Sequence, residues 1–225
     1  MMYFQHGGKI GDLIYALPVI RALGGGTLFM GENKKGDFPL ASKEALLPLL
    51  QAQSYIKDVY MHVPDGAAAL DLSVYLGHWG FVSQMPLWEG AARWLGLPVS
   101  IADDPWLKVR PRYIARTVYC RSLDRNTHSG NGNSEQYPDH YESVFLGSPA
   151  EYVAFAAAGH DGIRYWPTAN LLEAAEIIAG CEKFYSNTTG LLAVALGVGK
   201  KPMHIERSPL VSRMVPEHPF PNRRW

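Results

Sequence analysis

A short apolar run, a glycine-rich loop and an apolar helical pattern open the chain, and this order constrains the fold more than any other feature. Residues 2–5 predict a strand, and residues 13–23 carry apolar side chains at helical spacing. The loop between them runs from His6 to Asp12 and contains three glycines. Three further glycines end the helix, and residues 27–30 predict a second strand parallel to the first. A strand–loop–helix–strand unit of this kind predicts a parallel sheet covered by helices.

The same alternation continues through the first half of the chain. Ser42 is placed to cap a helix over residues 43–51, and a strand is expected within residues 55–63. Residues 70–74 predict another strand and residues 87–95 another helix. A proline-punctuated, basic stretch from Asp104 to Arg116 then interrupts the pattern. We therefore place a first Rossmann-like domain at residues 1–104.

A second alternating series follows that stretch. The predicted strands cover residues 117–121, 144–147, 163–166, 183–186 and 202–205, and the predicted helices cover residues 149–157, 167–179 and 191–198. Four prolines between residues 208 and 225 argue against a long closing helix. Residues 105–225 therefore form a second Rossmann-like domain with a proline-rich tail, and the fold class is α/β.

The overall composition excludes several classes of protein. Lys plus Arg and Asp plus Glu number 21 each, so no net field attracts nucleic acid, and such a partner would need a local basic patch. Apolar residues make up 47% and charged residues 19%, an ordinary balance for a globular protein. No apolar run is long enough to cross a membrane and no signal-peptide pattern opens the chain, so we expect a cytoplasmic protein.

The first loop has the composition of an anion site. Glycines at a strand–helix junction let a ligand approach the backbone, and the N–H groups at the start of a helix favour negative charge. The residues expected to form this acceptor or phosphate loop are His6, Gly7, Gly8, Lys9 and Gly11. Their spacing is not that of the dinucleotide-binding fingerprint. Asp12 is either an ordinary helix N-cap or a general base at the mouth of the sheet.

A second loop, Ser186-Asn187-Thr188-Thr189-Gly190, lies between a strand and an apolar helix. Small hydroxyl side chains and a glycine at a helix N-terminus supply the donors that a diphosphate requires. The alternative is a simple capping loop.

Six cations gather around the middle of the chain: Lys108, Arg110, Arg112, Arg116, Arg121 and Arg125. We expect Lys108, Arg110 and Arg112 to be solvated. Arg121 and Arg125 follow the first strand of the second half, at the sheet edge where α/β proteins bind ligands, and are candidates for phosphate neutralisation. The eight histidines and two cysteines have no metal-ligand spacing, so no metal site is predicted.

Together these blocks resemble the ADP-heptose:lipopolysaccharide heptosyltransferases, glycosyltransferase family 9. The similar segments are GDLIYALPVIRAL at residues 11–23, FLGSP at 145–149, LLEAAEIIAGC at 171–181, SNTTG at 186–190 and ALGVGKKP at 195–202. The resemblance implies a GT-B fold, in which two Rossmann-like domains face a cleft, the first holding the acceptor and the second the nucleotide-sugar. It implies a hexosyl- or heptosyltransferase-like enzyme that transfers the sugar without a metal and inverts the configuration at the anomeric carbon. In this mechanism Asp12 is the base, and Thr189 and Gly190 bind the donor diphosphate.

Three readings of the acceptor and activity remain open on the sequence. The family acts on glycan or lipopolysaccharide precursors, whereas some viral GT-B enzymes glycosylate a hydroxymethylated base in DNA. A non-catalytic nucleotide-binding module is the third alternative, because Thr188 and Ala193 stand where the family has Asp and His. No cofactor beyond the nucleotide-sugar co-substrate is expected.

Overall fold

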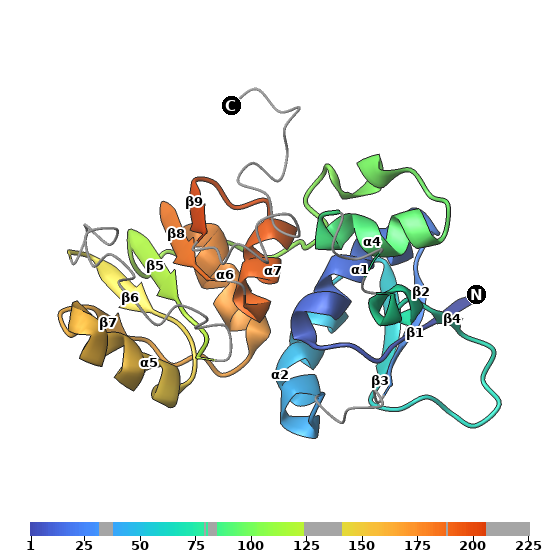
Figure 1. The fold of residues 1–225 in the computed structure, drawn as a ribbon, viewed down its shortest axis with the longest axis horizontal. Coiled ribbons are helices and arrows are strands. Elements are labelled where there is room, and N and C mark those ends of the chain that lie inside the picture. Colours follow the sequence, from blue (N-terminus) through green and yellow to red (C-terminus); the bar gives the residue numbers. More distant parts are fainter. Residues whose placement is uncertain (32–37, 79, 81–84, 124–140, 188, 206–225) are drawn as a thin grey trace.

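The computed structural model describes residues 1–31, 38–78, 80, 85–123, 141–187 and 189–205. Within them the chain forms two sheets, one in each half (Figure 1), and every paired strand runs parallel to its neighbour. The first sheet has the strand order β3-β2-β1-β4 and the second has the order β7-β6-β5-β8-β9. This is the α/β, GT-B-like architecture that the sequence predicts.

The first half contains these elements in chain order: β1 (Met2–His6), α1 (Ile10–Ala22), β2 (Gly26–Met30), α2 (Leu40–Gln51), β3 (Ile56–Tyr60), β4 (Leu70–Asp71), the 3₁₀ turn η1 (Val74–Gly77), α4 (Leu87–Trp94) and the 3₁₀ turn η2 (Val99–Ala102). The second half contains β5 (Thr117–Cys120), β6 (Ser143–Phe145), α5 (Pro149–Phe155), the π-helical turn η4 (Ala156–His160), β7 (Arg164–Tyr165), α6 (Leu171–Gly180), β8 (Lys183–Ser186), α7 (Gly190–Gly197) and β9 (Met203–Ile205). The two sheets lie on either side of the proposed boundary at residue 104, which itself stays a prediction.

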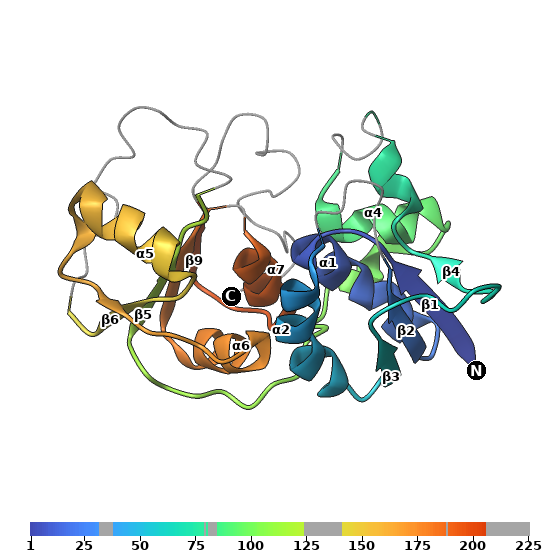
Figure 2. The ribbon, with the colours of Figure 1, turned by 90° about the horizontal axis from the view of Figure 1, so that it is seen from below.

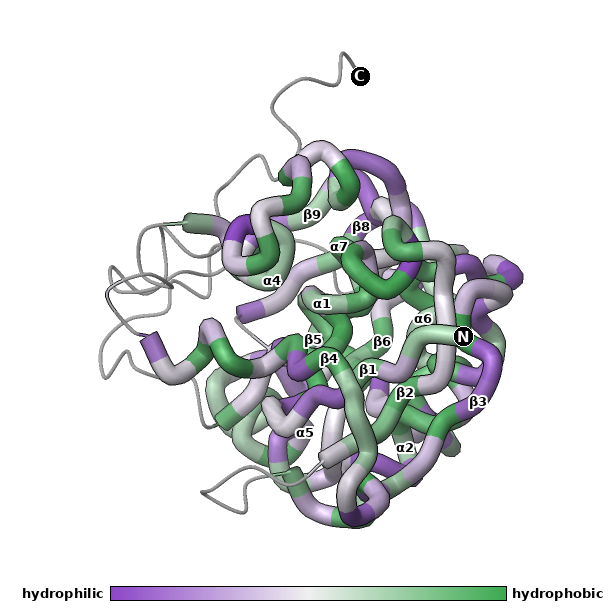
Figure 3. Tube along the Cα trace, turned by 90° about the vertical axis from the view of Figure 1, so that its right-hand side faces the viewer, coloured by the Kyte–Doolittle hydropathy of each residue, from purple (hydrophilic) through white to green (hydrophobic). Residues whose placement is uncertain are grey.

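Helices from both halves pack between the two sheets (Figure 2). The α1 helix lies against α7 and α2 lies against α6, so that one hydrophobic core runs through both halves. Residues 13–20 of α1 are all buried, as are residues 192–197 of α7. Figure 3 shows both helices as strongly hydrophobic, which is the pattern of helices enclosed by protein on every side. The contact between the halves is therefore part of the core.

Residues 101–107 form a connecting strap between the two halves, and this strap is held in place near the C-terminus of α1. The Arg21 guanidinium donates to the carbonyl oxygens of Ile101 and Pro105, each at 2.7 Å. Further along, the Tyr55 hydroxyl donates to the Trp106 carbonyl at 2.6 Å, and the Leu107 N–H donates to the Gly197 carbonyl at 2.9 Å.

Three predicted boundaries are wrong, each for a local reason. Ser42 does not cap α2, because the extended backbone of Pro39 leads directly into a helix that begins at Leu40. The predicted strand over residues 70–74 ends at Asp71, whose carboxylate accepts the backbone N–H and the hydroxyl of Ser73 at 2.8 and 2.6 Å and so turns the chain. The helix expected from residue 167 starts at Leu171, because the side chain of Asn170 accepts the Glu173 N–H and caps it.

Within the described ranges, no helix is long and apolar enough to cross a membrane.

Candidate functional site

Asp12 lies in the first turn of α1, at the carboxyl end of β1. Lys9 is the N-cap residue, and the Asp12 carboxylate accepts the Lys9 backbone N–H at 3.2 Å. Asp12 is therefore the third helical residue of a capping box, and the alternative that made it the N-cap residue is wrong. In this position the carboxylate sits among the N–H groups at the positive end of the α1 dipole. Its role as a general base stays a prediction.

The buried ring of His6 holds the glycine loop through a hydrogen bond to its backbone. It is fully buried, and its Nδ1 accepts the Gly8 N–H at 3.0 Å, which leaves the ring proton on Nε2. Burial lowers the pKa of His6 to about 4, against a smaller opposing effect of the Asp71 charge. A neutral imidazole therefore fixes the loop, with Gly7 half-buried and Gly8 buried beside it.

The N-terminus of α7 forms the second part of the site. Thr189 is its N-cap, as the capping interpretation predicts, and the Thr189 hydroxyl accepts the Leu192 N–H at 3.1 Å. The Ser186 hydroxyl is buried, donates to the Asn187 carbonyl at 2.7 Å and lies 3.3 Å from the Thr189 hydroxyl. These hydroxyls are engaged within the protein. A ligand here would meet mainly the backbone N–H groups of the first helical turn other than that of Leu192, which the Thr189 hydroxyl already accepts.

The side chain of Asn187 joins two loops at the carboxyl edge of the second sheet. Its Oδ1 accepts the Ser122 N–H and its Nδ2 donates to the Ser122 carbonyl, both at 2.9 Å. Arg121 immediately precedes Ser122 and follows β5, at the sheet edge where the sequence places it. The sequence predicts that Asn187 binds the nucleotide-sugar donor. It does not predict that the Asn187 side chain joins these two loops. Thr188 and Arg125 lie outside the described residues.

The two glycine-bearing helix N-termini meet directly. A Cβ placed on Gly11 would lie 3.8 Å from the Gly190 Cα and 3.8 Å from the Ala193 Cβ. On Gly190 it would lie 3.1 Å from the Ile10 Cγ2, closer than an ordinary contact. The N-termini of α1 and α7 thus lie side by side, and at Gly190 a larger residue would need its neighbour Ile10 to move.

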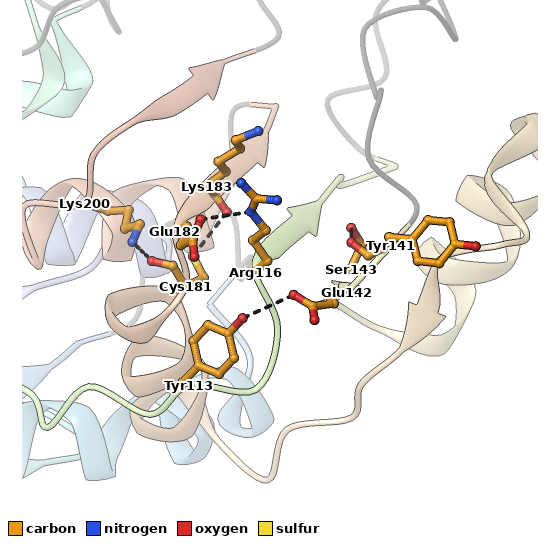
Figure 4. Close-up of polar contacts among 9 residues, drawn as sticks. All are labelled: Tyr113, Arg116, Tyr141, Glu142, Ser143, Cys181, Glu182, Lys183 and Lys200. Carbon is orange, nitrogen blue, oxygen red and sulfur yellow. Dashed lines mark hydrogen bonds and ion pairs between the residues drawn. The ribbon is translucent and has the colours of Figure 1, made fainter.

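The remaining cations of the basic stretch lie elsewhere. Lys108 and Arg110 are exposed, as predicted. Arg112 pairs with Glu173 at 2.9 Å, and Arg116 pairs with Glu182 at 2.9 Å, both at the surface. Figure 4 shows the Arg116–Glu182 pair beside the start of β8, with the Tyr113 hydroxyl directed at Glu142 nearby. This cluster lies at the amino ends of the strands, opposite the edge that carries Arg121.

Comparison with known proteins relates the chain to one group of solved structures. No protein-family model and no curated protein matches the sequence. The E. coli heptosyltransferase WaaC with ADP-2-deoxy-2-fluoro heptose is similar at 13% identity and a TM-score of 0.52, over 96% of this chain and 96% of that chain. The same enzyme with ADP is similar at 13% identity and a TM-score of 0.52, over 96% of this chain and 94% of that chain. At this identity the similarity confirms the heptosyltransferase-like fold that the sequence blocks indicate.

Proposed function

We propose that the protein is a glycosyltransferase that transfers a sugar from a nucleotide-sugar to an acceptor hydroxyl, with inversion and without a metal. The close approach of Gly11 to Gly190 carries this proposal, because the N-termini of α1 and α7 lie side by side there. Asp12 lies in the first turn of one of these helices. The heptosyltransferase-like fold supports the same class of reaction, since WaaC was solved with ADP and an ADP-sugar analogue.

The donor diphosphate belongs at these helix ends. Two helix N-termini that point toward one region favour an anion there through their dipoles and unused N–H groups. Thr189 and Gly190 provide the start of α7, and Gly7 to Gly11 provide the loop before α1. Arg121, at the end of β5, supplies a cation on the same side of the second sheet.

Asp12 then acts on the acceptor. Its carboxylate accepts the proton of the attacking hydroxyl while the acceptor oxygen forms a bond to the anomeric carbon. The bond between that carbon and the diphosphate oxygen breaks on the opposite face, and the nucleoside diphosphate leaves with the electron pair. The helix N-termini and Arg121 stabilise the negative charge that develops on the leaving group.

A glycan-type hydroxyl is the acceptor that we favour. Duplex DNA would require a strip of uncompensated cations, and two of the six in the basic stretch, Arg112 and Arg116, pair with carboxylates of the same chain.

Donor screening with a matched pair of variants tests the proposal. UDP-, GDP-, ADP- and CMP-sugars are screened by thermal shift and by release of nucleoside diphosphate. We expect one donor class to stabilise the wild type and to be hydrolysed slowly. Asp12→Asn should abolish release and keep the thermal shift, whereas Asp65→Asn, on an exposed loop, should change neither. Wild-type turnover in Asp12→Asn removes Asp12 as the base; stabilisation without turnover in the wild type favours the non-catalytic module.

A further inference from the structure

Four polar side chains from three elements surround the start of α1. They are His6 at the end of β1, Asp12 and Tyr15 on α1, and Tyr75 in η1. Gly8 marks the place where these elements meet. A Cβ on Gly8 would lie 2.6 Å from the His6 Cε1, 2.9 Å from the Asp12 Cβ and 2.9 Å from the Cδ1 of Leu76, the neighbour of Tyr75.

Tyr15 and Tyr75 are held rigidly on the α4 side of this cluster. Tyr15 follows Asp12 by three residues, so the two side chains share one face of α1. The centroid of the Tyr15 ring lies 6.2 Å from the centroid of the Trp88 ring. Gly90 lies directly against the Tyr75 ring, because a Cβ there would come within 2.4 Å of Tyr75 Cε2. Packing thus leaves these two aromatic rings little freedom.

The hydroxyls of both tyrosines are buried polar groups without a hydrogen-bond partner among the residues that the structure describes. Tyr15 is 3% exposed and Tyr75 is 1% exposed. A buried hydroxyl is normally paired, and leaving one unpaired costs about 1–3 kcal/mol. Phenylalanine at either position would avoid this cost, so two such hydroxyls beside a candidate base indicate a role in binding or catalysis.

The Asp12 carboxylate affects the pKa of both tyrosine hydroxyls. Burial raises the pKa of each tyrosine far above its usual value, and the Asp12 carboxylate raises it further. Tyr15 raises the pKa of Tyr75 as well. Both therefore stay protonated and remain hydrogen-bond donors close to a carboxylate.

We propose that Tyr15 and Tyr75 are positioning residues for Asp12: their hydroxyls donate toward its carboxylate in the reacting complex and hold it aimed at the acceptor. This inference rests on the proposed function. Hydrogen bonds at a catalytic group are often loose without substrate and tighten when the substrate is bound. Donors to a carboxylate stabilise its charged form, so the tyrosines keep Asp12 ionised as well as oriented.

The other titratable groups near this cluster are His6, Asp71 and Lys9. His6 lies across Gly8 and is neutral, and its own acidic neighbour, Asp71, comes from β4. On the side of α7, residues 189–193 carry no titratable side chain. Lys9 contacts Asp12 through its backbone N–H.

Phenylalanine variants test the proposal, because they remove the hydroxyls and keep the rings. The variants are Tyr15→Phe, Tyr75→Phe and the double variant, with Tyr55→Phe as the matched control. Tyr55 is a partly buried tyrosine, but its hydroxyl donates to the Trp106 carbonyl in the strap. Donor turnover is measured against pH, and the Asp12 carboxyl is titrated by NMR in protein labelled with ¹³C-aspartate, its signal assigned from Asp12→Asn.

Each single variant should lower kcat about tenfold, the worth of one net hydrogen bond, with the KM for the donor unchanged. The Asp12 carboxyl should take up its proton at higher pH, and the acid limb of the pH profile should move with it. Tyr55→Phe should lose thermal stability and leave the pH profile in place. An Asp12 titration unchanged in the double variant overturns the inference. A wild type without donor turnover refutes the proposed function instead, while the NMR titration still decides whether the tyrosines act on Asp12.

Discussion

Gly8 offers a direct test of the packing around Asp12, through the addition of one methyl group. In Gly8→Ala the new carbon would lie 2.6 Å from the His6 Cε1 and 2.9 Å from the Asp12 Cβ, whereas ordinary contacts begin at 3.4 Å. The third close atom, Leu76 Cδ1, ends a flexible side chain and can rotate away. The His6 ring is held by the Gly8 N–H and the Asp12 Cβ by the helix. The overlap must therefore displace part of the site.

The magnitude follows from two opposing effects. Overpacking a tight site costs about 1–3 kcal/mol. Restricting the unfolded chain with alanine returns about 0.4–1 kcal/mol. We therefore expect Gly8→Ala to lower the free energy of unfolding by about 1–2 kcal/mol. Each kcal/mol corresponds to about 2–4 °C in Tm for a protein of this size. Turnover should fall further, because misplacing a catalytic group by about 1 Å can cost a hundredfold in rate.

Urea denaturation and donor turnover measure the two effects in the same preparations. Gly77→Ala is the control, since a Cβ on Gly77 meets nothing within 4 Å. It should stay within about 0.5 kcal/mol of the wild type. A Gly8→Ala protein as stable and as active as the wild type would refute the reasoning, because it would mean that the loop around Gly8 is not tightly packed against His6 and Asp12.

Two more predictions concern the residues that support each loop. His6 has a pKa of about 4 in the folded protein and 6.5 in the unfolded chain. Its contribution to the free energy of unfolding is therefore complete above pH 6.5 and is lost as the pH falls toward 4. The loss amounts to about 3 kcal/mol. Urea midpoints measured between pH 4 and 7 should show this loss in the wild type and in the control His204→Gln, whose histidine is exposed. The loss should be missing in His6→Gln. An equal pH slope in His6→Gln would contradict this assignment. Thr189→Ala should lower the free energy of unfolding by about 1 kcal/mol through loss of the α7 cap, and Thr189→Ser should retain most of it; equal Tm values for the two variants would argue against the capping role.

The sequence predicts the elements of this fold well because their signals are local. Apolar periodicity and glycines near residues 24–26 suffice to place β1, α1 and β2, and the same holds for β8 and α7. The errors also have local causes that a single sequence hides. The helix that starts at Leu40 and the turn made by the Asp71 carboxylate depend on backbone geometry at one residue.

The site is harder to predict because its parts meet only after the halves dock. Two glycine loops in corresponding positions suggested two anion sites, but no pattern within either loop indicates that Gly11 and Gly190 lie side by side. The bonds between Asn187 and Ser122 join residues 65 positions apart. Tyr15 and Tyr75 look like ordinary core aromatics in the sequence, and only burial without a partner among the described residues sets them apart.

The pair of hydrogen bonds between Asn187 and Ser122 has a consequence for the thermodynamics of ligand binding. Because both polar groups of one buried amide hold the backbone of the other loop, the segment around Arg121 and the segment before α7 lose their conformational freedom together. A ligand that orders one segment therefore does not bear a separate entropic cost for the other. Substituting Asn187 would make the two segments independent, so affinity at the helix end would become sensitive to a loop that the ligand need not touch.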